Sequence, residues 1–330
     1  MKITNLALPF LLSVSISLVA CSENAATPST QQDTKLTIEK TNSADTVQPE
    51  TSTNQNSSEI IDQKTIDSGG SGPYKAIAVT EESLADFVIY RPQDITAAAQ
   101  SEGKLPVVVF ANGGCNNTSI PHERLLSEVA SQGYLVVALG ALQRELLDRE
   151  LNKAPNAMMI EAIDWLSAKS AEKDSEYFQK LDMNQIAISG QSCGGAQVLA
   201  VAADLRIKTY LMFNSGIGDM TMAQANQDSL NNLHGPVLYI VGGESDVATA
   251  NAELDYKRIS HVPVAFSNLL AGGHGGTFDQ KYGGSFAKMT LNWLDWQLKG
   301  KTEKAEFFLA QNLAAFPGWT MKSKQFQAAN

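Results

Sequence analysis

The feature that most constrains the fold is a glycine-flanked serine between an apolar segment and an alanine-rich one. Residues 186–189 read Ile-Ala-Ile-Ser, residues 190–194 read Gly-Gln-Ser-Cys-Gly, and Ser192–Ala203 has the composition of a helix. The glycines permit a tight, strained turn that joins a strand directly to a helix and raises the serine hydroxyl above the sheet. This pattern is common by chance, so its position between strand and helix carries the prediction. The alternative is a turn that only begins a helix.

The rest of the chain alternates between apolar runs and segments with helical spacing. Leu105–Ala111 is continuously apolar, as in a central strand buried on both faces. The sequence predicts an α/β fold of about eight strands in a mostly parallel sheet, with helices on both faces and the first two strands as an antiparallel edge. Strands are expected near Lys75–Thr80, Asp86–Arg91, Leu105–Ala111, Tyr134–Leu139, Gln185–Ser189, Lys208–Phe213, Pro236–Val241 and Val262–Leu269, and helices near His122–Gln132, Asn156–Ala168, Ser192–Ala203, Ala248–Lys257 and Ser285–Leu298.

The first twenty residues have the composition of an export signal. Lys2 provides a positive charge, Leu6–Leu12 is apolar, and the run ends at Leu18-Val19-Ala20-Cys21. Serines interrupt this stretch, which is too short for a span of roughly 20 apolar residues. The ending resembles the lipobox of bacterial lipoproteins, which implies that Cys21 becomes the lipidated first residue and, with Ser22 after it, favours the outer membrane. The alternative is an ordinary secretory signal with an incidental cysteine.

The segment after Cys21 is polar and acidic. Residues 22–72 contain no aromatic residue and have eight acidic residues against three basic ones. Such a segment cannot bury enough apolar surface to offset its chain entropy. We therefore expect a signal peptide at 1–20, a lipidated Cys21 with a disordered tether over 21–72, and one catalytic domain over 73–330. A coil of about 50 residues has a reach of roughly 40 Å, enough to hold the domain clear of a lipid surface.

The acidic balance of the chain excludes one class of partner. The formal net charge is −10, whereas nucleic-acid phosphates require basic patches. We therefore expect no nucleic-acid partner and membrane contact through the lipid anchor only. The sequence does not predict a protein partner.

A serine hydroxyl needs a base to take its proton, and after such a turn the partners follow in chain order serine, acid, histidine. Of the four histidines, His122 precedes the serine, and His234 and His261 lie before the strands they would have to follow. His274 follows the strand near Val262–Leu269 in the run Ala-Gly-Gly-His-Gly-Gly. That is the carboxyl end of a strand, where open α/β sheets place their sites. His274 is the predicted base.

The acid is expected in the loop after Pro236–Val241. That loop offers Glu244 and Asp246, while Asp255 falls in the next expected helix. Asp246 precedes His274 by 28 residues, and its role would be to hold the imidazole tautomer and stabilise the imidazolium. We predict Asp246, with Glu244 as an ordinary loop carboxylate.

Acyl transfer also needs donors for the developing oxyanion. One is expected from the backbone N–H of Cys193, the residue after the serine. The second is expected from the loop Asn112-Gly113-Gly114, where Gly114 is favoured and Gly113 is the alternative.

Cys115 and Cys193 remain as an even pair if Cys21 is lipidated. Both lie in the loops expected to form the oxyanion hole, and an exported protein enters an oxidising compartment. A disulfide between them would fix the geometry of the hole; the alternative is two free thiols beside the pocket.

Several motifs together resemble a known family. Val-Val-Val-Phe-Ala-Asn-Gly-Gly-Cys, Ile-Ser-Gly-Gln-Ser-Cys-Gly-Gly, Val-Gly-Gly-Glu-Ser-Asp, Gly-His-Gly-Gly-Thr-Phe and Pro-Gly-Trp-Thr resemble secreted α/β-hydrolases of the dienelactone-hydrolase, cutinase and polyester-hydrolase branch. The likeness covers nearly all of residues 73–330. It implies an α/β-hydrolase fold, a triad of Ser192, Asp246 and His274, and an oxyanion hole at Cys193 and the Gly113-Gly114 loop. It implies a mechanism rather than a particular ester.

The sequence therefore predicts a serine hydrolase that cleaves carboxylic esters through an acyl-enzyme, without a metal or cofactor. The link between the strands near Lys208–Phe213 and Pro236–Val241 is about twenty residues, too short for a large lid. A small or extended ester is the expected substrate. The alternatives are an amidase or peptidase with the same triad, or a surface lipoprotein that binds a ligand without turnover.

Overall fold

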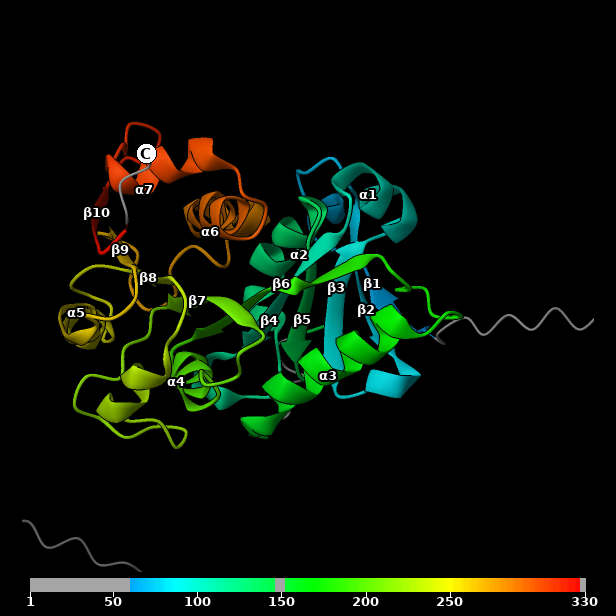
Figure 1. The fold of residues 1–330 in the computed structure, drawn as a ribbon, viewed down its shortest axis with the longest axis horizontal. Helices are drawn as coiled ribbons and strands as arrows, with labels where there is room; N and C mark the ends of the chain where they lie inside the picture. The colour runs from blue at the N-terminus through cyan, green and yellow to red at the C-terminus, as the bar shows by residue number, and fades with distance from the viewer. Residues whose placement is uncertain (1–59, 146–151, 327–330) are drawn as a thin grey trace, which may run out of the picture. The chain divides into compact units, whose positions relative to one another are not determined.

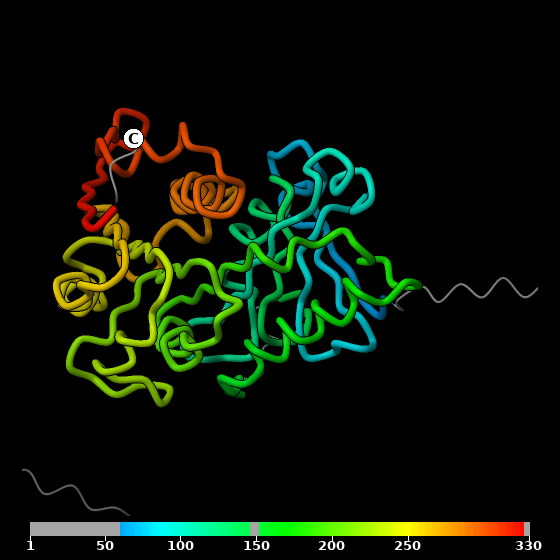
Figure 2. The backbone as a smooth tube through the Cα atoms, in the orientation of Figure 1, coloured from blue at the N-terminus to red at the C-terminus, as the bar shows by residue number. Residues whose placement is uncertain are grey.

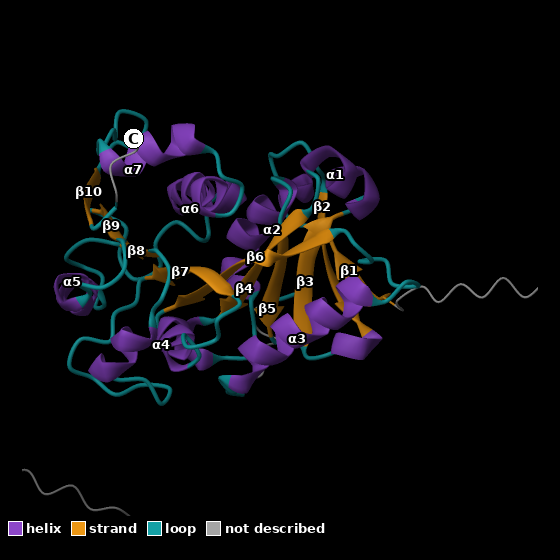
Figure 3. Ribbon diagram, in the orientation of Figure 1, coloured by secondary structure: helices purple, strands orange, loops and turns teal. Residues whose placement is uncertain are grey.

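The computed structural model describes residues 60–145 and 152–326, which form a sheet flanked by helices (Figures 1 and 3). The strands are β1 Ile60–Lys64, β2 Ala76–Glu81, β3 Phe87–Pro92, β4 Leu105–Ala111, β5 Leu135–Leu139, β6 Leu181–Gln191, β7 Ile207–Phe213, β8 Val237–Val241, β9 Val264–Leu269 and β10 Trp319–Lys324. The α-helices are α1 Ile95–Glu102, α2 Glu123–Ser131, α3 Ala157–Ala171, α4 Cys193–Ala200, α5 Thr249–Arg258, α6 Gly284–Gln297 and α7 Ala305–Leu309.

The sheet is parallel in its centre and antiparallel at both ends. Its order is β1-β2-β3-β5-β4-β6-β7-β8-β9-β10. Every pair from β5 to β9 is parallel, whereas β1, β2 and β3 pair antiparallel and β3 joins β5 antiparallel. The C-terminal β10 returns antiparallel to β9; it is the red end of the trace in Figure 2. The predicted α/β fold with a mostly parallel sheet is confirmed.

Two apolar cores lie on the two faces of the sheet, because successive side chains of a strand point to opposite sides. In β4, Val107 and Val109 belong to the core under α3, α4 and α5, whereas Val108 and Phe110 belong to the core under α2 and α6. The whole of β4 is buried. This double coverage explains why the strand reads as a continuous apolar run.

The number of strands and the C-terminal end of the tether differ from the predictions. The sheet has ten strands rather than eight, since β1 and β10 were not predicted. Both are edge strands with half-exposed polar residues, so neither has the apolar pattern of a buried strand. The predicted tether was also too long at its C-terminal end. Residues 60–64 pair with β2, and the Asp67 carboxylate accepts a hydrogen bond from the Tyr282 amide.

The predictions for the N-terminus concern residues that the structure does not describe. The signal peptide at 1–20, Cys21 and the tether up to residue 59 are outside the described residues. Over 60–145 and 152–326, no helix is both long enough and apolar enough to cross a membrane.

Candidate active site

Ser192 lies in a tight turn between β6 and α4. Its φ of 53° and ψ of −118° place it in a region that residues with a side chain rarely adopt. Gly190 allows this turn because a Cβ there would lie 2.3 Å from the carbonyl carbon of Gly194. The strand holds one side of the turn, and the Ser192 amide donates to the Phe213 carbonyl of β7 at 2.9 Å. The serine is thereby presented at the carboxyl edge of the parallel strands.

Loops from three strands bring an acid, a histidine and this serine together. Nε2 of His274 lies 3.0 Å from Oγ of Ser192. Nδ1 of His274 lies 2.7 Å from Oδ1 of Asp246. The Asp246 side chain is completely buried, whereas that of His274 is 37% exposed. A continuous hydrogen-bonded line therefore runs from a buried carboxylate to a solvent-accessible hydroxyl.

The surroundings of Asp246 favour its ionised form. Burial alone raises the pKa of this carboxyl, but hydrogen bonds from His274, the Ala248 amide, the Asn214 side chain and the Gly242 amide outweigh it, so the pKa is lowered. The Ala248 amide lies 3.0 Å from Oδ1 and the Gly242 amide 2.9 Å from Oδ2. Asp246 is thus held as an anion in a single orientation.

Asn214, at the carboxyl end of β7, was not predicted as a site residue. Its Nδ2 donates to Oδ2 of Asp246 at 2.7 Å and to the Gly273 carbonyl at 3.0 Å. One amide group therefore ties the loop of the acid to the loop of the histidine. A single asparagine after a strand has no motif, so the sequence carries no signal for it.

The alternative acids do not line the cavity of Ser192. Glu244 is exposed in the same loop as Asp246. Asp255 is buried within α5, as its expected position in a helix requires, and accepts from the amides of Ile217 and Gly218. Burial raises its pKa above the usual range. Asp255 therefore anchors the loop after β7.

The other histidines have two kinds of position. His234 hydrogen-bonds with the Tyr210 hydroxyl and the Ile207 carbonyl, and His261 with the Leu233 carbonyl, all at the opposite edge of the sheet from Ser192. His122 is different, because it lines the cavity beside Ser192 although its order in the chain excludes it as the predicted base.

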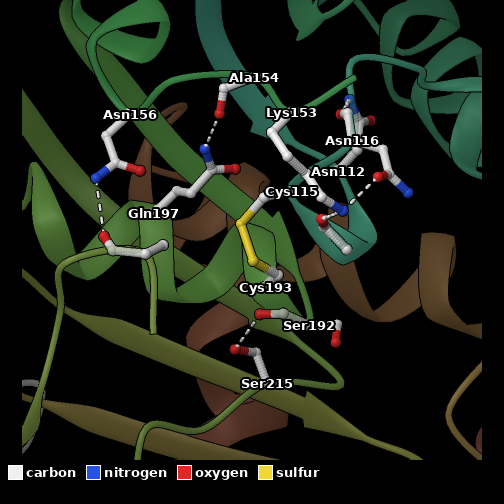
Figure 4. The surroundings of a disulfide bond; sticks show 12 residues. Asn112, Cys115, Asn116, Lys153, Ala154, Asn156, Ser192, Cys193, Gln197 and Ser215 are labelled. Atoms are coloured by element: carbon white, nitrogen blue, oxygen red, sulfur yellow. Dashed lines mark hydrogen bonds between the residues drawn. A yellow bond between two sulfur atoms is a disulfide. The ribbon is translucent and has the colours of Figure 1, made fainter. Parts of the chain in front are cut away.

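The loop after β4 approaches the turn of Ser192 and is joined to it covalently. Cys115 and Cys193 form a disulfide with their Cα atoms 5.1 Å apart (Figure 4). Cys193 is the first residue of α4, so its amide has no acceptor within the helix. In the loop, the Cys115 amide donates to the Asn112 carbonyl and the Asn116 amide to the Gly113 carbonyl. The amides of Gly113 and Gly114 come directly before these two bonded amides in the chain.

Gln191, directly before the serine, connects both sides of the site. Its Nε2 donates to the His274 carbonyl at 3.2 Å. Its Oε1 packs so closely on Gly113 that a Cβ there would lie 2.0 Å away. The sequence analysis gave Gln191 no role beyond its place between glycine and serine in the turn motif. Its bridging contacts exist only because the loops of Gly113 and His274 meet in the fold.

The serine opens onto a cavity of about 560 Å³. Its wall includes Gly113, Gly114, His122, His274 and Phe278, and Asp279 is its only Asp, Glu, Lys or Arg among the described residues. The wall thus offers backbone amides and aromatic surface, with no fixed positive charge. Elsewhere in 60–145 and 152–326, no three His, Cys, Asp or Glu side chains converge as metal ligands would.

His122 is buried in the wall of this cavity between two phenylalanines. Its ring centroid lies 4.9 Å from that of Phe110 and 4.8 Å from that of Phe278. Burial lowers the pKa of His122 to about 3, and a hydrogen bond with Gln191 offsets this only in part. At neutral pH, His122 is therefore an uncharged part of the wall.

The fold and the residues at the edge of its parallel strands define a hydrolase of the α/β-hydrolase type. A family model described as Chlorophyllase matches residues 66–230, half of the chain. The chain therefore belongs to the chlorophyllase family. The matched part includes Ser192 and both bonded cysteines, while Asp246 and His274 follow it. A search of curated proteins finds no match to this chain.

Proposed function

We propose that this protein is a serine esterase that hydrolyses carboxylic esters through an acyl-enzyme. The observation that carries the proposal is the hydrogen-bonded line Asp246–His274–Ser192, with distances of 2.7 and 3.0 Å, at the mouth of a cavity. The need to pair buried polar groups does not explain these hydrogen bonds, because the His274 side chain is partly exposed. Its Nε2 hydrogen-bonds with the hydroxyl of a serine in a strained turn.

In the proposed reaction, Oγ of Ser192 attacks the ester carbonyl while Nε2 of His274 takes the hydroxyl proton. Asp246 holds the imidazole and stabilises the imidazolium without taking the proton. His274 then gives the proton to the departing alkoxide, which leaves as the alcohol. A water molecule attacks the acyl-enzyme with its proton passing to His274, and the acid is released as the Ser192 hydroxyl is restored.

The amides of Cys193 and Gly114 are proposed as donors to the oxyanion, with Gly113 as the alternative. Helix α4 begins at Cys193, so the partial positive charge of its N-terminus also favours charge at this point. The neighbouring amides of Cys115 and Asn116 already donate within the loop. The two glycine amides are therefore the donors that this loop offers to a substrate.

An uncharged ester fits the cavity best. Its aromatic and glycine-lined wall has Asp279 as its charged side chain, which disfavours an anionic substrate. The link from β7 to β8 holds only the short 3₁₀ turn Gln227–Asn232, consistent with a site without a large lid. Since the family is named for chlorophyllase, a chlorophyll ester belongs among the substrates to be tested. Esters of the kind that cutinases cleave belong there too, because the sequence resembles cutinase-like hydrolases.

We propose that the protein is lipid-anchored outside the cytoplasm, in the outer membrane of a bacterium. The support is the Leu-Val-Ala-Cys ending at Cys21, followed by Ser22. Labelling of cells with radioactive palmitate tests this directly. Labelled wild type and unlabelled Cys21→Ser are expected, and labelling of both would exclude Cys21 as the acylated residue.

The test of function is a panel of p-nitrophenyl esters of graded chain length, with a fluorophosphonate probe for the nucleophile. Wild type is expected to react with both, and Ser192→Ala with neither. Ser167→Ala is the matched control, since its hydroxyl donates to a carbonyl within α3. Turnover by folded Ser192→Ala would reject the nucleophile. Faster cleavage of an anilide than of the matched aryl ester would favour an amidase, and a wild type that neither labels nor turns over would favour a ligand-binding lipoprotein.

A further inference from the structure

The loop predicted to supply an oxyanion donor has a strained backbone conformation. Gly114 has a φ of 65° and Cys115 a φ of 53°. Two successive residues in the left-handed region are uncommon, and a residue with a Cβ costs roughly 1–2 kcal/mol there. The loop has two amide–carbonyl hydrogen bonds of its own, and contacts from outside the loop add to them in holding this strained conformation.

The segment that leads into α3 supplies these contacts. Lys153 and Asn116 form an isolated antiparallel bridge, and the Ala154 amide donates to the Cys115 carbonyl at 2.9 Å. The ammonium of Lys153 donates to the Gly114 carbonyl at 2.6 Å and to Oδ1 of Asn116 at 2.9 Å (Figure 4). A cation thus spans the turn and binds the carbonyl of the glycine at its centre.

Lys153 reaches the loop from outside the substrate cavity. Gly114 and Asn116 line the cavity of Ser192. Lys153 lines a separate cavity of about 450 Å³, together with Asn117 and Gly140. Its ammonium therefore acts on the turn rather than on a substrate beside Ser192.

The same segment is tied to the helix of the nucleophile. Nε2 of Gln197 in α4 donates to the Ala154 carbonyl at 2.7 Å. The disulfide joins Cys115 to the first residue of that helix. The turn at Gly114 is thus held by the ammonium on one side and by a covalent bond on the other.

We propose that Lys153 is a positioning residue for the oxyanion hole. Its ammonium fixes the Gly114 carbonyl, which sets the backbone angles of Gly114 and so the direction in which the amide of this residue points. The disulfide restrains the same turn independently through Cys115. This inference rests on the proposed esterase function, because an oxyanion donor has a role only if an oxyanion forms.

The first test compares Lys153→Met, which keeps the aliphatic stem and removes the ammonium, with Lys153→Arg, which restores two donors. Lys153→Met is expected to lower kcat for p-nitrophenyl butyrate roughly ten- to thirtyfold, part of the 10²–10³-fold effect of losing a donor outright. KM is expected to change less than about threefold, since the ground-state carbonyl needs the donor less. Lys153→Arg is expected to recover most of kcat.

Lys180→Met is the matched control. Lys180 also donates to a backbone carbonyl at 2.6 Å, that of Glu176, but it lies just before β6 begins, at the opposite edge of the sheet from Ser192. The kcat of Lys180→Met is expected to equal that of wild type. Unchanged kcat in Lys153→Met, a loss confined to KM, or an equal loss in Lys180→Met would each overturn the proposal.

A second measurement separates the inference from the proposed function. Phenylboronic acid forms a tetrahedral adduct with an active serine and places an oxygen where the oxyanion would lie. Its inhibition constant is expected to rise in Lys153→Met by the same factor by which kcat/KM falls, and an unchanged constant would overturn the inference. Turnover by Ser192→Ala would instead reject the function itself, whereas inactive Ser192→Ala beside unimpaired Lys153→Met would reject only the role of Lys153.

Discussion

Two histidines with opposite surroundings line the cavity beside Ser192. His274 is partly exposed and hydrogen-bonded at both ring nitrogens, to a buried carboxylate and to the serine hydroxyl. His122 is buried against two phenyl rings, and its Nδ1 has no hydrogen-bond partner among the described residues. The neighbours of an imidazole, rather than its presence in a pocket, decide its role: burial keeps His122 uncharged, whereas a carboxylate holds His274 against the serine hydroxyl.

The largest effect is expected from replacing each of the two histidines in turn. His274→Ala should lower kcat/KM for a p-nitrophenyl ester by about 10⁴-fold or more, because the serine loses its base. His122→Phe keeps an aromatic ring in the wall and should cost less than about tenfold. Initial rates at pH 8, with circular dichroism to check folding, measure both. Comparable losses in the two variants would break the distinction between the two histidines.

An intermediate effect is expected from the link between the loops of the acid and the histidine. Asn214→Leu removes the donor to Asp246 and to the Gly273 carbonyl while roughly keeping the volume. A lost hydrogen bond to a charged group is worth about 1.5–3 kcal/mol, so kcat should fall about 10- to 100-fold. Asn292→Leu is the control, since its amide also donates to a backbone carbonyl, that of Lys288 in α6. A wild-type rate in Asn214→Leu would show that Asp246 is oriented without this contact.

The third effect is expected in stability rather than in rate, and only in acid. His122 has a pKa of about 3 in the folded protein and an ordinary value of 6.5 in the unfolded chain. Between these values the unfolded chain binds one proton more, so the free energy of unfolding falls as the pH falls. The slope from this one group is about 1.4 kcal/mol per pH unit. Well above pH 6.5 the unfolded chain is also unprotonated at this group, which then contributes no pH dependence.

Urea denaturation at pH 7 and pH 5 measures this contribution. Between the two, wild type should lose about 2 kcal/mol more unfolding free energy than His122→Phe, because only wild type has the buried imidazole. The same loss in both proteins would show that His122 is not held neutral by burial. Activity at pH 8 should not follow this transition, since His122 is uncharged there in both states.

Most of the fold was predictable because its central strands are covered on both faces. β4 was predicted with its observed bounds, since a strand buried on both sides has no polar position. β1 and β10 were missed because an edge strand can remain polar. Helix α1 was also missed, although Asp94 caps its first turn by accepting from the Ala97 amide and Gly103 follows its last residue. Those capping signals are in the sequence, but few apolar residues accompany them.

For the candidate site, the residues with a place in a motif were predicted and those without one were not. Ser192, Asp246 and His274 each follow a strand in a set order along the chain, and the structure brings these three together. Asn214 and Lys153 belong to no motif. Each acts on a loop from another part of the chain, so its contact exists only once the sheet has formed.

By itself, the sequence determined the order of the central strands β2 to β9 and the chemical groups that end them, because periodicity and glycine placement are local properties. Only the tertiary structure decided which loops meet. It placed His122 beside Ser192, joined Cys115 to Cys193 and set the ammonium of Lys153 on the Gly114 carbonyl. The physical reason is that the carboxyl ends of parallel strands converge at one edge of the sheet, so residues far apart in the chain become neighbours there.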